Sequence, residues 1–248
     1  AGRLAMFLEH IINLGAFFCY ACTYATGSLT SGMMLSVLLC TLLVFSMETL
    51  ASRCNANMFL ISLAMNLLFA AFTTFFSALL FKTRGVLASD AVQFSAPTMR
   101  LVASVACYAV VGILLFMLRF TGTGLILRVT GSDADVLESE GVAVARYRSL
   151  AWIIAAGCGA LAGCVYTARL SAFVPGGAAG RGWTALAAVY LGRKHPLLVV
   201  LAVAAFAIAE YASTAIQNIA LFAALPTSVL LALPYLLALA LIVLVPRR

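Results

Sequence analysis

The dominant feature of this chain is a succession of long apolar segments separated by short polar ones. Hydrophobic residues make up 65% of its 248 residues, and charged residues make up only 9%. A soluble domain of this length needs many more polar side chains to cover its surface. Helices of about 20 apolar residues cross the hydrocarbon of a bilayer with their backbone hydrogen bonds satisfied. We therefore expect an all-α polytopic membrane protein.

Eight hydrophobic segments can be delimited, and one of them is too short to span a bilayer as a straight helix. They cover approximately residues 8–26, 33–50, 58–80, 101–120, 150–170, 183–192, 197–214 and 228–245. The sixth has about ten residues, a rise of about 15 Å, and it follows a Gly- and Pro-rich stretch. We expect either a broken helix buried within the protein or a short span.

Residues 121–149 form the longest hydrophilic passage of the chain. Within this passage, eight consecutive positions hold four of the eight acidic residues of the chain, namely Asp133, Asp135, Glu138 and Glu140. Ser132 is a favourable N-cap with Asp135 three residues later, and Gly141 can adopt the left-handed conformation that ends a helix. The pattern predicts a short helix of about two turns that is too polar for hydrocarbon. This helix either connects two spans in solvent or docks onto another protein.

The basic residues indicate how the chain is oriented in the membrane. With residues 121–149 on the cytoplasmic side and the segments alternating, ten of the fifteen Lys and Arg residues lie inside and five outside. The net charge of +7 is therefore read as an orientation signal rather than as a nucleic-acid footprint. We expect both termini in the cytoplasm. The chain begins with Ala rather than Met, and we expect further residues upstream.

A few polar side chains lie inside the apolar segments. Asn66 lies midway along the third segment, and Glu210 lies deep in the seventh. An ionisable group in hydrocarbon is costly unless it faces a cavity or a polar partner. Each of the two therefore either lines a path for a hydrophilic solute or bonds to a neighbouring helix. Glu48, close to Arg53, is expected at the membrane interface.

The fifth segment also carries a packing motif. Gly159 and Gly163 are separated by three residues, which places them on one face of a helix. Small residues at this spacing let two membrane helices approach closely. We expect a helix–helix contact here rather than a binding function.

The sequence contains no motif that points to catalysis or to metal binding. Cys19 and Cys22 have the spacing of a metal or redox pair, but no second half-site accompanies them, and cysteine is an ordinary small apolar residue in such helices. Neither a nucleophile–base arrangement nor a GxxxxGK[ST] phosphate loop is present. We expect a protein that is not an enzyme, binds no cofactor or metal, and does not hydrolyse ATP by itself.

Several motifs resemble those of ABC importer permeases of the nucleoside and simple-sugar type. The most specific lies after the fifth segment, where FVPG at residues 173–176 precedes AGRGWTALAA at 179–188 and GRKHPL at 192–197. LILRVTG at residues 125–131 is similar to the cytoplasmic segment of that family. The resemblance covers nearly the whole chain. It departs from the family at residues 131–134, which read GSDA where relatives have GENP, and at His10, where relatives have Gly.

The resemblance implies a single transmembrane permease domain over residues 1–248, with residues 121–149 as a coupling segment in the cytoplasm. Such permeases work with a second identical or homologous permease subunit, with ATP-hydrolysing subunits that bind the nucleotide, and with an extracytoplasmic binding protein. The residues expected to contact the ATPase are Asp133, Asp135, Val136, Leu137, Glu138 and Gly141. Those expected along the substrate path are Asn66, Phe173 and Glu210.

The function implied is import across a bacterial inner membrane, with membrane lipid around the chain. Nucleosides are the expected substrates, and simple sugars or branched-chain amino acids are the alternatives. A secondary transporter would be expected to show paired broken helices, whereas one interruption is visible. An intramembrane enzyme would need a nucleophile facing a base. Both remain rival hypotheses from other classes.

Overall fold

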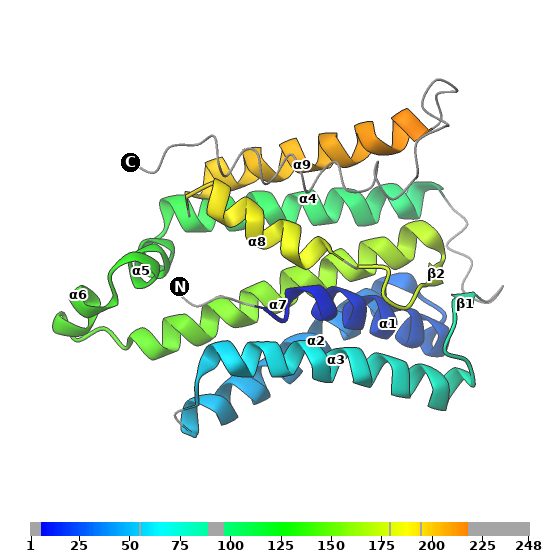
Figure 1. Ribbon diagram of the computed structural model, residues 1–248, viewed down its shortest axis with the longest axis horizontal. Helices are drawn as coiled ribbons and strands as arrows, with labels where there is room; N and C mark the ends of the chain where they lie inside the picture. The colour runs from blue at the N-terminus through cyan, green and yellow to red at the C-terminus, as the bar shows by residue number, and fades with distance from the viewer. Residues whose placement is uncertain (1–5, 55, 89–96, 179, 194, 218–248) are drawn as a thin grey trace. The chain divides into compact units, whose positions relative to one another are not determined.

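The computed structural model describes residues 6–54, 56–88, 97–178, 180–193 and 195–217, and these are predominantly helical (Figure 1). Five of the described helices are long and apolar enough to cross a membrane: α2 (Leu29–Arg53), α3 (Met58–Phe81), α4 (Pro97–Phe120), α7 (Val144–Leu170) and α9 (Pro196–Gln217). The expectation of an all-α polytopic membrane protein is confirmed. The chain divides into two compact units, Ala1–Ala179 and Gly180–Arg248.

The count of eight spans is not reached among the described residues. The first expected segment is a helix, α1 (Leu8–Thr26), but Glu9, His10 and Asn13 make it too polar to qualify as a span by composition. The sixth is α8 (Arg181–Leu191), whose 11 residues rise only about 16 Å, half a bilayer. The eighth, residues 228–245, lies outside the described residues.

Helix α1 is the centre of the first unit. It contacts α2, α3 and α7, and in Figure 1 it lies between α7 and α3. Its aromatic side chains enter the core, where the rings of Phe17 and Phe173 meet edge to face with centroids 5.4 Å apart. Beside the first turn of α1, the rings of Phe7 and Trp152 lie 5.0 Å apart. The most buried helix of this unit is thus also one that carries several polar residues.

The predicted contact at Gly159 and Gly163 is confirmed, and its partner is α1. A Cβ added to Gly163 would collide with the backbone of Ile12 and Ala16, and one added to Gly15 would lie 2.6 Å from the Cα of Ala160. The backbones are therefore close enough for side chains to bond across the contact. Thr167 Oγ1 donates to the Ala16 carbonyl at 3.1 Å. Close packing and hydrogen bonds replace the hydrophobic driving force that lipid does not supply between helices.

The two ends of the first unit differ in structure. At one end a two-residue ladder joins β1 (Leu87–Ala88), after α3, to β2 (Ala172–Phe173), after α7, in antiparallel register. At the other end two short helices, α5 (Gly122–Ser132) and α6 (Ala134–Ser139), connect α4 to α7. Because α7 runs from the α6 end to the ladder, one rigid helix links the two.

In the described residues of the second unit, two helices form a pair. Helix α8 packs on α9 through the buried side chains of Ala188, Ala202 and Phe206. The turn between them is tight, since a Cβ added to Gly192 would lie 2.5 Å from the backbone nitrogen of Val199. Helix α8 begins after Gly180, whose φ of 82° requires a residue without a Cβ. The short sixth segment is therefore a half-length helix that folds back onto the following span.

Candidate functional site

The hydrophilic passage folds as two helices rather than one. Thr121 is the N-cap of α5, and its hydroxyl accepts a hydrogen bond from the backbone N–H of Gly124 at 3.2 Å. Gly124 itself lies against α4, because a Cβ added there would be 2.6 Å from the Cα of Leu118. The chain can therefore turn sharply out of α4. Helix α5 then contacts α7, and α6 contacts both α5 and α7.

The predicted cap of the short helix is wrong. Ser132 is the last residue of α5, and its hydroxyl donates to the carbonyl of Val129 at 3.2 Å. A serine that bonds back three residues along its own helix is not free to cap the next one. Asp133 takes the N-cap position of α6 without a side-chain cap bond. Helix α6 itself, with six residues, is close to the length predicted.

The far end of α6 closes as the sequence indicates. Gly141 has a φ of 76°, in the left-handed region. Its N–H donates to the Glu138 carbonyl at 3.1 Å, and the N–H of Val142 donates to the Leu137 carbonyl at 3.0 Å. These bonds satisfy carbonyl groups that the end of a helix leaves open. The glycine thus lets the chain reverse into α7 within a few residues.

The two larger apolar side chains of α6 differ in exposure. Leu137 is 8% exposed and is packed against the chain itself, whereas Val136 is 50% exposed. The acidic residues around them, Asp133, Asp135, Glu138 and Glu140, are all exposed. Leu137 therefore anchors the helix, and its neighbours form an outer surface with one apolar side chain among carboxylates. The role of these residues in coupling stays a prediction.

Asn66 bonds to a neighbouring helix. Its Oδ1 lies 2.9 Å from the Nδ1 of His10 and accepts a hydrogen bond from the His10 backbone N–H at 3.4 Å. Helices α1 and α3 are thereby joined near the beginning of α1. Of the two readings left open by the sequence, this geometry supplies the helix–helix bond. A role for Asn66 on the substrate path stays a prediction.

Glu210 and Phe173 are also held by their own surroundings. The Oε1 of Glu210 lies 3.5 Å from the Nη2 of Arg181, which joins α9 to α8, and the Glu210 side chain is 58% exposed. Phe173 is 1% exposed and belongs to the β1–β2 ladder. Glu210 belongs to the second unit, whereas Asn66 and Phe173 belong to the first. Their roles on a path also stay predictions.

Sequence reasoning missed Asn13, a polar residue of α1 that bonds to two other parts of the chain. It is 6% exposed. Its Nδ2 donates to Thr73 Oγ1 of α3 at 3.4 Å, and its Oδ1 accepts from the N–H of Gly176 at 3.2 Å. One amide thus ties α1 both to α3 and to the Gly/Pro stretch. A signal was available, because Asn13 follows His10 by three residues and Thr73 follows Asn66 by seven, so both pairs lie on one helix face.

Glu48 is paired within the chain, and its expected place at the membrane interface stays a prediction. It is 5% exposed, and its Oε1 accepts a hydrogen bond from Ser149 Oγ at 2.6 Å. The bond joins α2 to the first turns of α7, at the last residue of the hydrophilic passage. Among the residues that the structure describes, no group of three or more His, Cys, Asp or Glu side chains could hold a metal ion.

Comparison with known protein families shows to which family the chain belongs. A family model described as "Branched-chain amino acid transport system / permease component" matches residues 8–246. The match runs from the first residue of α1 across both units and includes the hydrophilic passage. No curated protein and no solved structure matches this chain. A match over nearly all of the sequence shows the family: the chain is a multi-pass membrane protein that belongs to the ABC permeases of the branched-chain amino acid and simple-sugar type.

Proposed function

We propose that this chain is the membrane-spanning subunit of an ATP-driven importer, and that α6 receives the movement of an ATPase subunit. The observation that carries the proposal is the outer surface of α6. Exposed carboxylates surround Val136, while Leu137 holds the helix to the chain. Charged groups of this density do not enter hydrocarbon. They suit a partner with basic residues around a small apolar pocket.

The fold supplies a route from this surface into the membrane. Helix α7 begins at Val144, close after α6, and its 27 residues extend about 40 Å. The close glycine contact binds α1 to α7, so the two helices move together. A displacement of α6 would therefore shift the α1–α7 pair and, through it, the Gly/Pro stretch beyond β2. Packed interfaces of this kind switch between discrete arrangements rather than deforming gradually.

The proposal includes the partners and the location. Two permease subunits enclose the path, ATPase subunits supply the energy, and a binding protein delivers the solute at the end that carries the β1–β2 ladder. Both units of the chain form one permease domain in a bacterial inner membrane. The match to a permease family supports these partners in general terms.

Nucleosides are the substrate class that we propose. The support is the similarity of residues 173–197 to permeases of the nucleoside and simple-sugar type. A branched-chain amino acid is the second candidate, because the matching family is described by that substrate. The two classes differ chemically, since a nucleoside offers hydroxyl groups and an amino acid offers a carboxylate and an ammonium group. Uptake of labelled uridine, ribose and leucine by cells that overproduce the assembled transporter distinguishes them. Uptake of leucine alone would refute the nucleoside proposal.

The coupling role is tested on α6 itself. Val136→Asp removes the apolar side chain from the outer surface without touching the buried anchor. We expect solute-stimulated ATP hydrolysis by the co-purified complex to fall about tenfold or more, the effect of losing one anchor of an interface. Ala143→Asp is the matched control, because Ala143 is exposed on the same passage but outside α6. Equal stimulation in both variants would contradict the assignment of α6.

A further inference from the structure

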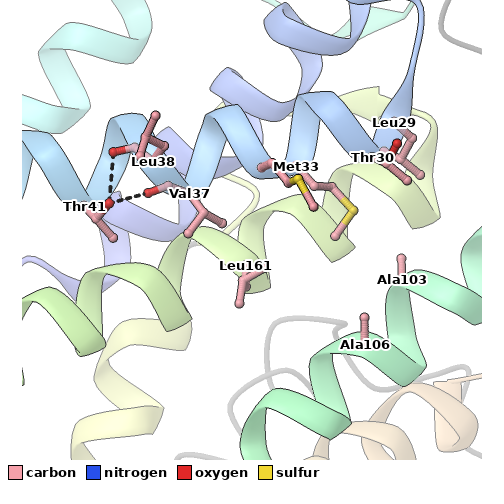
Figure 2. A pocket seen from close by; sticks show the side chains of 10 residues that line it. Leu29, Thr30, Met33, Val37, Leu38, Thr41, Ala103, Ala106 and Leu161 are labelled. Carbon is pink, nitrogen blue, oxygen red and sulfur yellow. Dashed lines mark hydrogen bonds between the residues drawn. The ribbon is translucent and has the colours of Figure 1, made fainter.

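A cavity of about 460 Å³ lies between α2, α4 and α7 (Figure 2). All three helices belong to the first unit, and no feature of the proposed coupling or transport path uses this space. Its walls are almost entirely hydrocarbon. They are formed by Leu29, Thr30, Met33, Met34, Val37, Leu38, Thr41, Ala103, Ala106 and Leu161.

The two hydroxyl groups of the wall are already engaged. Thr41 Oγ1 donates to the carbonyl oxygens of Val37 and Leu38 at 2.8 and 2.9 Å, the dashed lines in Figure 2. Thr30 Oγ1 lies 3.0 Å from the hydroxyl oxygen of Ser28. A hydrophilic solute that entered would lose its bonds to water and gain few in return. The occupant that fits the wall is therefore a hydrocarbon chain.

The depth of the cavity matches one leaflet of a bilayer. Its lining on α2 runs from Leu29, the first residue of the helix, to Thr41 in its middle. Twelve residues rise about 18 Å, and half of a hydrocarbon core is about 15 Å thick. A lipid tail that entered at the end of α2 would reach the midplane where the lining stops.

A positive charge is bonded to the residue that follows the cavity wall on α4. Arg169 is exposed in the last turn of α7, and its Nη2 donates to Ser104 Oγ at 3.2 Å. Ser104 follows Ala103, which lines the cavity near the beginning of α4. The bond to Ser104 uses one of five guanidinium donors and holds the group close to Ala103, which lines the cavity. Arginine in this position suits a phosphate, which it binds through paired charge-assisted hydrogen bonds.

We propose that this cavity is a phospholipid site, with one acyl chain between α2, α4 and α7 and the phosphate group at Arg169. The lipid fills the space between α4 and the α2–α7 pair and so becomes part of the packing of the subunit. The site goes beyond the proposed transport function, because it depends neither on the solute nor on the ATPase.

Depth-resolved photo-crosslinking tests the proposal. The full chain is placed in nanodiscs containing phosphatidylglycerol with a diazirine either near the ester or at the end of one acyl chain. We expect the shallow probe to label residues near Leu29 and Ala103 and the deep probe to label residues near Val37 and Thr41, each several-fold above the exposed faces of α3. Even labelling of all exposed helices would overturn the proposal. So would a crosslink that shows a second protein chain occupying the cavity.

Two pairs of variants sharpen the test. Ala106→Trp fills the cavity and should remove the ordered labelling, whereas Ala71→Trp, on an exposed position of α3, should leave it unchanged. If Ala106→Trp does not fold, Leu161→Phe makes the same change with a smaller side chain. Arg169→Gln should weaken labelling about tenfold, the loss expected for a charge-assisted bond to phosphate. Arg84→Gln is its control, an exposed arginine just before β1. Equal labelling in the two arginine variants would refute the headgroup contact.

Discussion

Helices α1 and α4 show opposite relations between composition and position. Helix α1 carries Glu9, His10 and Asn13, yet nine of its 19 residues are buried. Along α4 the span Ala103–Phe120 has a mean hydropathy of 2.0, yet only 6% of it is buried. In water the more apolar helix would be expected inside. In lipid, apolar surface is at no disadvantage outside, and the interior positions go to helices with small residues and paired polar groups.

We expect the largest loss of stability where the backbones of α1 and α7 approach closely, and one substitution disrupts this contact. Gly163→Leu places a side chain where the backbone of Ile12 and Ala16 already lies. We expect a loss of about 3 kcal/mol or more, with little folded protein recovered. Gly112→Leu on α4 is the control, because a Cβ there meets no atom within 4 Å. Yield and thermal stability in detergent measure both variants, and equal behaviour would remove the distinction between the two helices.

The hydrogen bonds of Asn13 come next in size. Asn13→Leu deletes its bonds to Thr73 and Gly176 while keeping the volume and raising the hydropathy of α1. We expect a loss of about 1 to 3 kcal/mol, since single bonds between membrane helices contribute about 0.6 to 1.7. Thr74→Val serves as control, because the Thr74 hydroxyl bonds only within its own helix, to Ala70. A more stable Asn13→Leu protein would show that hydropathy, not pairing, governs the burial of α1.

Asn66 separates a packing role from a transport role. Asn66→Leu breaks the bond to His10 and should cost about 1 kcal/mol. If Asn66 acts only in packing, stability falls and the uptake per folded transporter is unchanged. Reduced uptake at normal yield and stability would support the substrate path instead. Unchanged uptake and stability together would remove Asn66 from both roles.

The smallest effect is expected in the second unit. Glu210→Gln weakens an ion pair whose two side chains are about half exposed. Exposed pairs contribute about 0 to 1 kcal/mol, so a thermal shift near the error of the measurement is expected. Arg181→Gln should behave alike. A large destabilisation in either variant would show that this pair lies in a more apolar environment than its exposure indicates.

The sequence predicted what local patterns determine. The extent of α1, the short helix near Asp135 and the contact at Gly163 follow from apolar length, polar clustering and small-residue spacing. The side chains that bond to Asn66 and Glu210 could not be predicted from the sequence. A hydrogen bond across two helices depends on how the helices are rotated about their axes relative to each other. The sequence also could not predict that Val136 is exposed while Leu137 is buried. A helix of six residues is too short to show a periodic apolar face.

The β1–β2 ladder places a condition on how the chain is made. Leu87 pairs with Phe173, so the ladder closes only after the whole stretch between them, including α4 and α7, has been synthesised and inserted. When β1 leaves the ribosome, its partner strand β2 has not yet been synthesised. Pairing of such widely separated residues requires a large loop to close first, which makes it a late event in folding. The ladder therefore forms late, after α1, α2 and α3 have been made, and it completes the first unit rather than starting it.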